Sequence, residues 1–141
     1  SNADPQALVV ATAASQAVMQ LGMPEARIIL AQAATYVACA PKSNSAIMAI
    51  DGAMEFVKAH PDYKIPSYLQ DAHYKGAAKL GHGIGYKYAH DYKNHYARQQ
   101  YLPDACKDIH FYNLSEQGYE KRLKEHLTRI HRESEEDNGG Q

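Results

Sequence analysis

The sequence predicts an all-α fold, a helical bundle that carries one long irregular segment rich in tyrosine and glycine. In the first 60 residues, apolar side chains recur at three- and four-residue steps, which is the period of an amphipathic helix. Prolines and capping residues divide this part at short intervals. Successive helices with short connections favour helix-on-helix packing over a sheet.

The first half of the chain is expected to form helices over residues 5–21, 24–40 and 44–59. Asp4 and Pro5 begin the first helix, because Asp caps a helix and Pro suits its first turn, and Gly22 accepts the left-handed conformation after its end. Ser43 is the expected cap of the third helix. The first helix should bury Leu8, Ala11, Thr12, Ser15, Val18 and Met19. The third should bury an apolar seam of Ile47, Ile50, Met54 and Val57.

The character of the sequence changes after residue 61, since ten of the eleven tyrosines lie between Tyr63 and Tyr119. We expect a short helix over 67–73, an irregular stretch over 81–98, and a small two-stranded ribbon at most from 99–103 and 110–112. Ser115 should cap a last helix over 116–132. Its buried side should carry Tyr119, Leu123, Leu127 and Ile130. Residues 4–132 then form a single helical domain, between an expression-tag scar at 1–3 and a solvated acidic tail at 133–141.

Composition narrows the functional classes. A length of 141 residues suits one domain, and a net charge of -1 gives no global electrostatic case for binding nucleic acid or an anionic membrane. No apolar run is long enough to span a membrane, so no membrane partner is expected. Cys39 and Cys106 make neither a disulfide framework nor a metal pattern, which suits a reducing cytoplasm.

Glycines alternate in Gly81-x-Gly83-x-Gly85, but the sequence lacks the Gly-Lys-Ser/Thr of a phosphate-binding loop. Cys106 has His110 four residues on without a glycine-rich oxyanion turn, and its acidic neighbours disfavour the thiolate. Four histidines are candidate metal ligands by residue type, but they lack the i,i+4 pairing typical of a helical zinc site. They are His73, His82, His90 and His95. We therefore assign no catalytic, cofactor-binding or metal-binding residue.

One irregular segment is interpreted as a structural and contact element. Its expected residues are Gly81, His82, Gly83, Gly85, Tyr86, Tyr88, His90, Asp91, Tyr92 and Tyr101. The glycines should allow close backbone packing, and the tyrosines should anchor the segment and contact another subunit or domain.

An alternative interpretation is a module for single-stranded DNA built on residues 74–98, because basic residues follow phosphates while aromatic rings stack on bases. Its cations are Lys75, Lys79, Lys87, Lys93 and Arg98. The interleaved rings are those of Tyr74, Tyr86, Tyr88, Tyr92 and Tyr96.

Short phrases spread over the chain resemble one protein family. They are Asp4-Pro5-Gln6-Ala7-Leu8, Gly22-Met23-Pro24-Glu25-Ala26-Arg27-Ile28, Leu30-Ala31-Gln32-Ala33, Ala40-Pro41-Lys42-Ser43-Asn44, Asp71-Ala72-His73-Tyr74, Leu80-Gly81-His82-Gly83, Gly85-Tyr86-Lys87-Tyr88, His90-Asp91-Tyr92, Gln99-Gln100-Tyr101-Leu102-Pro103 and Gly118-Tyr119-Glu120. In this order they resemble the C-terminal region of the RarA/MgsA family, the replication-associated recombination AAA+ ATPases related to the eukaryotic Werner-helicase-interacting protein.

The resemblance implies an architecture and partners that the composition does not show. It implies a helical oligomerisation domain resembling the clamp-loader C-terminal collar, which assembles its parent into a homotetramer. The parent would bind ATP and Mg²⁺ in an upstream ATPase domain, so this part of the chain would not itself be an enzyme. The resemblance further implies action at stalled replication forks, partnership with single-stranded-DNA-binding protein and fork DNA, and a cytoplasmic, nucleoid-associated location in a bacterium.

Overall fold

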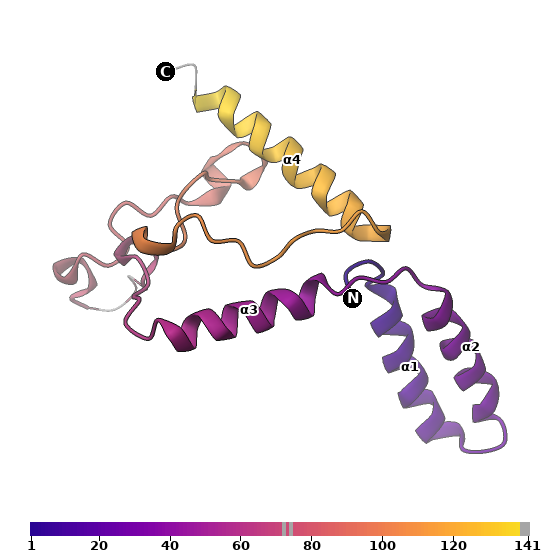
Figure 1. Ribbon diagram of the computed structural model, residues 1–141. Helices are drawn as coiled ribbons and strands as arrows, with labels where there is room; N and C mark the ends of the chain where they lie inside the picture. Colours follow the sequence, from indigo (N-terminus) through magenta and orange to yellow (C-terminus); the bar gives the residue numbers. More distant parts are fainter. Residues whose placement is uncertain (72, 74, 139–141) are drawn as a thin grey trace. The chain divides into compact units, whose positions relative to one another are not determined.

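The computed structural model describes residues 1–71, 73 and 75–138, and it confirms the all-α class (Figure 1). The α-helices are α1 (Gln6–Leu21), α2 (Ala26–Cys39), α3 (Ser45–Ala59) and α4 (Gly118–Asn138). Short 3₁₀ turns lie between α3 and α4: η1 (Ser67–Leu69), η2 (Ala77–Leu80), η3 (Ala89–Asp91), η4 (Lys93–His95) and η5 (Asp104–Cys106). The described residues contain no β-strand, so residues 99–103 and 110–112 do not form the small ribbon.

Contacts along the chain gather into two compact units. The first comprises Ser1–Asp51 with Tyr112–Glu125, and the second comprises Gly52–Phe111 with His126–Gln141. Each unit brings together two separated stretches of the chain, and the single domain over 4–132 stays a prediction.

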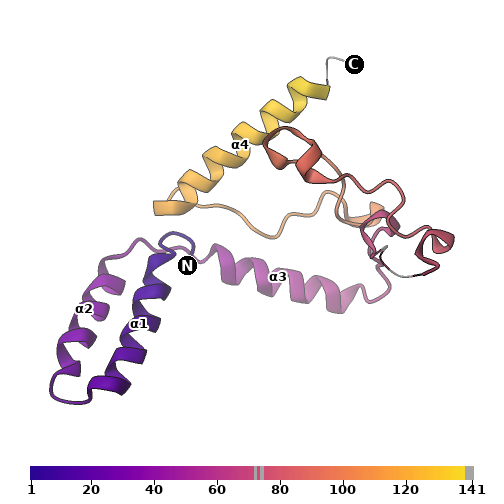
Figure 2. The same cartoon turned by 180° about the vertical axis from the view of Figure 1, so that it is seen from behind.

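In the first unit, α1 and α2 form a helical hairpin, which Figure 2 shows from behind. Asp4 caps α1 as expected, because its Oδ1 accepts a hydrogen bond from Gln6 N at 2.9 Å, and Tyr36 Oη donates to its Oδ2 at 3.1 Å. Gly22 follows α1 with φ +69°, a conformation that glycine adopts at little cost.

Small side chains face the inside of the hairpin. Ala14 and Ala26 are buried, and Val10, Ala17, Ile29 and Ala33 are half-buried. The expected inward face of α1 is wrong apart from the half-buried Val18, because Leu8 is 72% exposed and Met19 is 77% exposed. Alanines allow two helix backbones to approach closely, so the contact uses them and leaves the larger apolar side chains outside. Since α1 carries apolar residues around most of its circumference, its periodicity did not select the buried face.

Helix α3 begins as predicted, with Ser45 N donating to Ser43 Oγ at 3.1 Å. The face predicted to be buried is wrong. Ile47, Ile50, Met54 and Val57 are each more than half exposed. The half-buried residues of α3 are Ser45, Ala49, Gly52, Ala53 and Phe56. The apolar seam of α3, meaning Ile47, Ile50, Met54 and Val57, is therefore a surface of this chain.

The second unit contains an aromatic cluster. The Phe56 ring stacks on His60 with centroids 4.3 Å apart, and it lies 5.8 Å from Tyr63 and 5.7 Å from Phe111. Tyr68 Oη donates to the carbonyl oxygen of Gln100, which joins two irregular stretches. The helix expected over 67–73 is only the turn η1, and residue 72 lies outside the described residues.

Helix α4 begins two residues later than expected and continues past residue 132. Ser115 Oγ accepts from Gln117 N at 3.2 Å just before the helix. Ile130 is buried and Leu123 half-buried, whereas Tyr119 and Leu127 are exposed, so the predicted buried side is correct only in part. Residues 133–138, expected to belong to a solvated acidic tail, are helical, and Glu133 and Glu135 contact an irregular loop.

Candidate interaction surfaces

The predicted contact segment is half-buried at its start and exposed further on. Gly81, His82 and Gly83 are half-buried. The exposed members are Gly85, Tyr86, Tyr88, His90, Asp91, Tyr92 and Tyr101. Tyr86 and Tyr88 are each 55% exposed and Tyr92 is 42% exposed, so this chain covers their side chains only in part. Their rings are available for contacts outside the chain.

Two glycines of this segment, Gly81 and Gly85, serve the turn and not a close packing contact within this chain. Gly81, Gly83 and Gly85 have φ of +76°, +72° and +84°. A Cβ added at Gly81 or Gly85 would meet no atom within 4 Å. The expectation of close backbone packing at these two glycines is therefore wrong, and the left-handed conformation explains them. Gly83 N donates to the Ser67 carbonyl oxygen at 2.9 Å, which ties the turn to η1.

A groove of about 500 Å³ borders this turn. Its lining residues are Tyr68, Leu69, Gln70, Asp71, His73, Gly83, Tyr86 and Tyr88. Asp71 Oδ1 lies 2.6 Å from His73 Nδ1, with the two side chains 66% and 97% exposed. This carboxylate–imidazole pair is therefore open to solvent.

Most of the histidines that were candidate metal ligands contact aromatic rings or a carboxylate. His90 lies 5.1 Å from Tyr88 and 4.9 Å from His95, measured between ring centroids. His73 pairs with Asp71. Across residues 1–71, 73 and 75–138, no three His, Cys, Asp or Glu side chains gather as a metal site. Over the same residues, no helix is long and apolar enough to cross a membrane.

Several cations of the basic and aromatic segment are engaged within the second unit. Arg98 Nη1 lies 3.0 Å from Glu135 Oε1, and Lys93 Nζ lies 3.8 Å from Glu133 Oε2. Lys87 Nζ donates to the Arg98 carbonyl oxygen at 3.0 Å. Tyr74, which the single-strand hypothesis included, lies outside the described residues.

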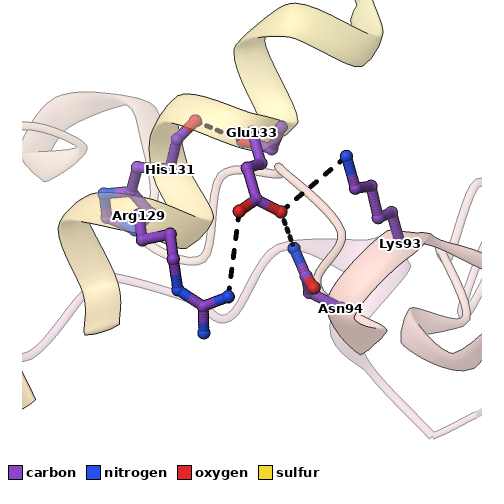
Figure 3. A network of polar contacts seen from close by, with 6 residues as sticks. Lys93, Asn94, Arg129, His131 and Glu133 are labelled. Carbon is purple, nitrogen blue, oxygen red and sulfur yellow. Dashed lines mark hydrogen bonds and ion pairs between the residues drawn. The ribbon is translucent and has the colours of Figure 1, made fainter. Parts of the chain in front are cut away.

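Glu133 is the centre of this network (Figure 3). Its Oε2 accepts from Asn94 Nδ2 at 2.8 Å, and its Oε1 lies 3.8 Å from Arg129 Nη1. The pKa of Glu133 is lowered, chiefly by the hydrogen bond from Asn94 and also by nearby cations such as Lys93 and Arg129, against the opposing effect of burial. The carboxylate is consequently ionised at neutral pH.

Sequence periodicity gave no indication of a second carboxylate, Glu120, which is fully buried in the first unit. Its Oε2 accepts from Ser43 Oγ and from Ser115 N, both at 2.9 Å, and its Oε1 accepts from Tyr112 Oη at 2.8 Å. Burial raises its pKa, but hydrogen bonds from Ser115, Tyr112 and Ser43 outweigh burial and lower the pKa to about 2. Glu120 thereby links the start of α3, the preceding loop and α4.

The N-terminal residues pack beside this network. Ala3 is 1% exposed, and its carbonyl oxygen accepts from Tyr119 N at 2.8 Å. Asn2 Nδ2 donates to Tyr112 Oη at 2.8 Å. Gly118 has φ +51°, and a Cβ there would lie 2.1 Å from the Ala3 carbonyl oxygen and 2.7 Å from Pro41 Cγ. Residues 2 and 3, expected to be remnants of a tag, are thus part of the packing of the first unit.

Large apolar side chains form a second surface. The hairpin leaves Leu8, Met19, Met23 and Ile28 each more than two-thirds exposed. A shallow groove of about 300 Å³ lies between α1 and α2, lined by Val10, Ala13, Ala14, Ala17, Ile29, Gln32 and Ala33. Helix α3 separately exposes its own apolar seam. Extended apolar exposure of this kind is typical of a surface that another protein chain covers.

The described residues thus form an all-α chain with exposed aromatic and apolar surfaces. Residues 1–131 match the family model described as "MgsA AAA+ ATPase C terminal". The chain belongs to this family.

Curated relatives agree with that assignment. The chain is 47% identical over 124 residues to replication-associated recombination protein A of Bacillus subtilis, covering 87% of this chain and 30% of the relative. It is 44% identical over 128 residues to an uncharacterized AAA domain-containing protein of Mycobacterium tuberculosis, covering 91% and 28%. Replication-associated recombination protein A of Haemophilus influenzae is 39% identical over 130 residues, covering 92% and 29%. The chain therefore spans less than a third of the length of these relatives.

Proposed function

We propose that this chain is the self-association domain of an AAA+ ATPase that acts in DNA replication, recombination and repair at stalled forks. In this proposal the parent protein is a homotetramer. Its upstream domain binds and hydrolyses ATP with Mg²⁺, while the residues described above contribute assembly and no catalytic group. Fork DNA and single-stranded-DNA-binding protein meet the full-length protein, in the cytoplasm at the nucleoid. Family membership and the names of the relatives support the cellular role.

The exposed seam of α3 is the observation that carries the proposal of self-association. Its residues are spaced by three, four and three positions, the a/d spacing of a coiled-coil seam. Two copies of α3 that pair antiparallel about a two-fold axis place Ile47 opposite Val57, and Ile50 opposite Met54. The seam is therefore complementary to itself.

The free energy gained by burying the seam is too small for the seam alone to hold two copies together. Its side chains are roughly half exposed, and fully burying an exposed aliphatic side chain is worth about 1.5–3 kcal/mol. Eight such half-exposed side chains in a pair of copies then contribute roughly 8 kcal/mol, which only offsets an association cost of about 4–15 kcal/mol. A stable assembly needs a further surface, and the apolar side of the α1–α2 hairpin supplies it. Two different interfaces are what a tetramer with two-fold axes requires.

Light scattering of the purified chain tests the proposal. At about 50 μM, well above the Kd of a stable assembly, we expect a mass that is a multiple of the 15.7 kDa chain. The variant Ile50→Glu/Met54→Glu should shift the mass down, because it buries charge in the seam. Ile65→Glu is the matched control, since Ile65 is 64% exposed and lies outside the helices. A monomeric wild type contradicts self-association, whereas an assembly unchanged by the double variant contradicts the role of the seam only.

A further inference from the structure

The last turns of α4 lie against the basic and aromatic loop within the second unit. Glu133 and Glu135 face this loop, with contacts of 2.8 Å to Asn94 and 3.0 Å to Arg98. The Tyr96 ring lies 5.4 Å from His131, measured between centroids, and so joins the same two stretches. Figure 3 shows Lys93 and Asn94 reaching the carboxylate of Glu133 from the loop side, and Arg129 reaching it along the helix.

The side-chain groups that contact Glu133 and Glu135 are of the same chemical types that bind phosphate in other proteins. An ammonium, a side-chain amide and a guanidinium converge here from Lys93, Asn94 and Arg98. Phosphate oxygens in protein–nucleic acid complexes accept mainly from such groups, and carboxylate and phosphate present similar paired oxygens to them. Glu133 and Glu135 therefore occupy positions that backbone phosphates would take.

Aromatic rings lie next to these donors along the loop. Tyr88 and Tyr92 are exposed, and His90 lies 5.1 Å from Tyr88 and 4.9 Å from His95, measured between ring centroids. Exposed rings interleaved with cations suit unstacked bases, because every base has a π-face that stacks without regard to sequence. A duplex, whose bases are already stacked, offers these rings nothing.

The α4 contacts are of a kind that a polyanion can replace. Arg98 and Glu135 side chains are 59% and 61% exposed, and Lys93 is 54% exposed, so their ion pairs contribute little net stability. Asn94 and His95 have φ of +58° and +52°, which is uncommon for residues other than glycine. The loop thus has a conformation of higher energy, to which the Asn94–Glu133 hydrogen bond contributes support.

We propose that the loop of residues 87–98 binds single-stranded nucleic acid, and that Glu133 and Glu135 of α4 mask its phosphate positions until a strand displaces them. The proposal is independent of the self-association proposed above. Lys93, Asn94 and Arg98 hold phosphates, and Tyr88 and Tyr92 stack on bases. The acidic end of α4 weakens binding and makes it depend on the length of strand that competes.

Fluorescence anisotropy with a labelled oligothymidylate of about 20 nucleotides, at 50 and 200 mM salt, tests the proposal. Glu133→Gln/Glu135→Gln should tighten binding by about tenfold, because two competing carboxylates lose their charge. Glu25→Gln/Glu55→Gln is the matched control, since it changes the net charge equally at exposed positions that belong to neither the loop nor α4. Equal tightening in both variants overturns the masking role.

Loss variants complete the test. Lys93→Ala/Arg98→Ala should weaken binding about tenfold and reduce the slope of log affinity against log salt by about 1.4, the value for two phosphate contacts on a single strand. Lys107→Ala/Lys121→Ala, at two other exposed cations, should change neither quantity comparably. Tyr88→Ala/Tyr92→Ala should weaken binding to the oligothymidylate but not to heparin, which has no bases. Absence of salt-sensitive binding in the unmasked variant, or equal effects of the tyrosine changes on both ligands, overturns the assignment to a nucleic-acid strand.

Discussion

Two glutamates on one helix, Glu120 and Glu133, have opposite surroundings. Glu120 is fully buried in the first unit and accepts hydrogen bonds from neutral donors, two hydroxyls and a backbone amide. The side chain of Glu133 in the second unit is 20% exposed, and its partners are an amide and the cations of Lys93 and Arg129. The pKa of each carboxyl is lowered, yet by different means.

Glu120 is a structural group, whereas Glu133 can exchange its partners. A buried carboxylate has no water to replace a lost partner, so each donor around Glu120 depends on it. A partly exposed ion pair exchanges its partners for water or another anion at little cost. Two glutamates on one helix can therefore have different roles. Glu120 holds the first unit together, and in our proposal Glu133 regulates access to the loop that it contacts.

The largest effect is expected when Glu120 is removed. Glu120→Ala leaves Ser43, Tyr112 and Ser115 N without their acceptor, so the free energy of unfolding should fall by roughly 3 kcal/mol. Glu133→Ala is the paired measurement, and it should cost much less, because solvent screens its partly exposed ion pairs. Urea unfolding followed by circular dichroism measures both. Similar losses in the two variants would erase the distinction between the glutamates.

A smaller effect should separate two glycines with positive φ. Gly118→Ala places a Cβ 2.1 Å from the Ala3 carbonyl oxygen, beside the Glu120 network, and should cost roughly 2–3 kcal/mol through both strain and overlap. Gly85→Ala meets open space at φ +84°, so only the backbone strain of about 1 kcal/mol remains. Thermal unfolding of both variants checks the difference. A Gly118→Ala protein as stable as Gly85→Ala would show that Ala3 does not pack there.

The smallest effect concerns pH. The pKa of Glu120 falls from 4.5 to about 2 on folding, so its stabilising contribution is complete above about pH 5 and is lost as the pH falls toward 2. Between pH 6 and 3.5 this group should account for about 1 kcal/mol of lost stability. Urea unfolding of the wild type and Glu120→Gln at both pH values measures it as the difference in slope. Parallel pH profiles would remove Glu120 as the cause.

Local features of the fold could be predicted from the sequence. The caps at Asp4 and Ser43 and the positive φ of Gly22 follow from side-chain and backbone chemistry within a few residues. The all-α class follows from periodicity over whole helices. The C-terminal boundary of α4 could not be predicted from the sequence, because its last turns depend on contacts with Lys93 and Arg98, which are distant in sequence.

The candidate surfaces were predicted less completely. The sequence identified the basic and aromatic segment, but the ion pairs of Lys93 and Arg98 with α4 have no local signal. The sequence predicted that Gly81 and Gly85 allow close backbone packing, whereas the structure explains them by their positive φ. A positive φ and a close contact both require glycine, so the sequence alone does not distinguish the two causes.

The sequence by itself determined the helical elements, their caps and the family, because these depend on short-range periodicity and on residue identity. Only the tertiary structure decided which apolar face each helix buries. Alanines in α1 and α2 allow close approach, and Phe56 joins an aromatic cluster, so these faces are covered while the larger seam of Ile47, Ile50, Met54 and Val57 stays outside. The burial of Glu120 was likewise decided by donors from separate stretches of chain, whose convergence no local pattern encodes.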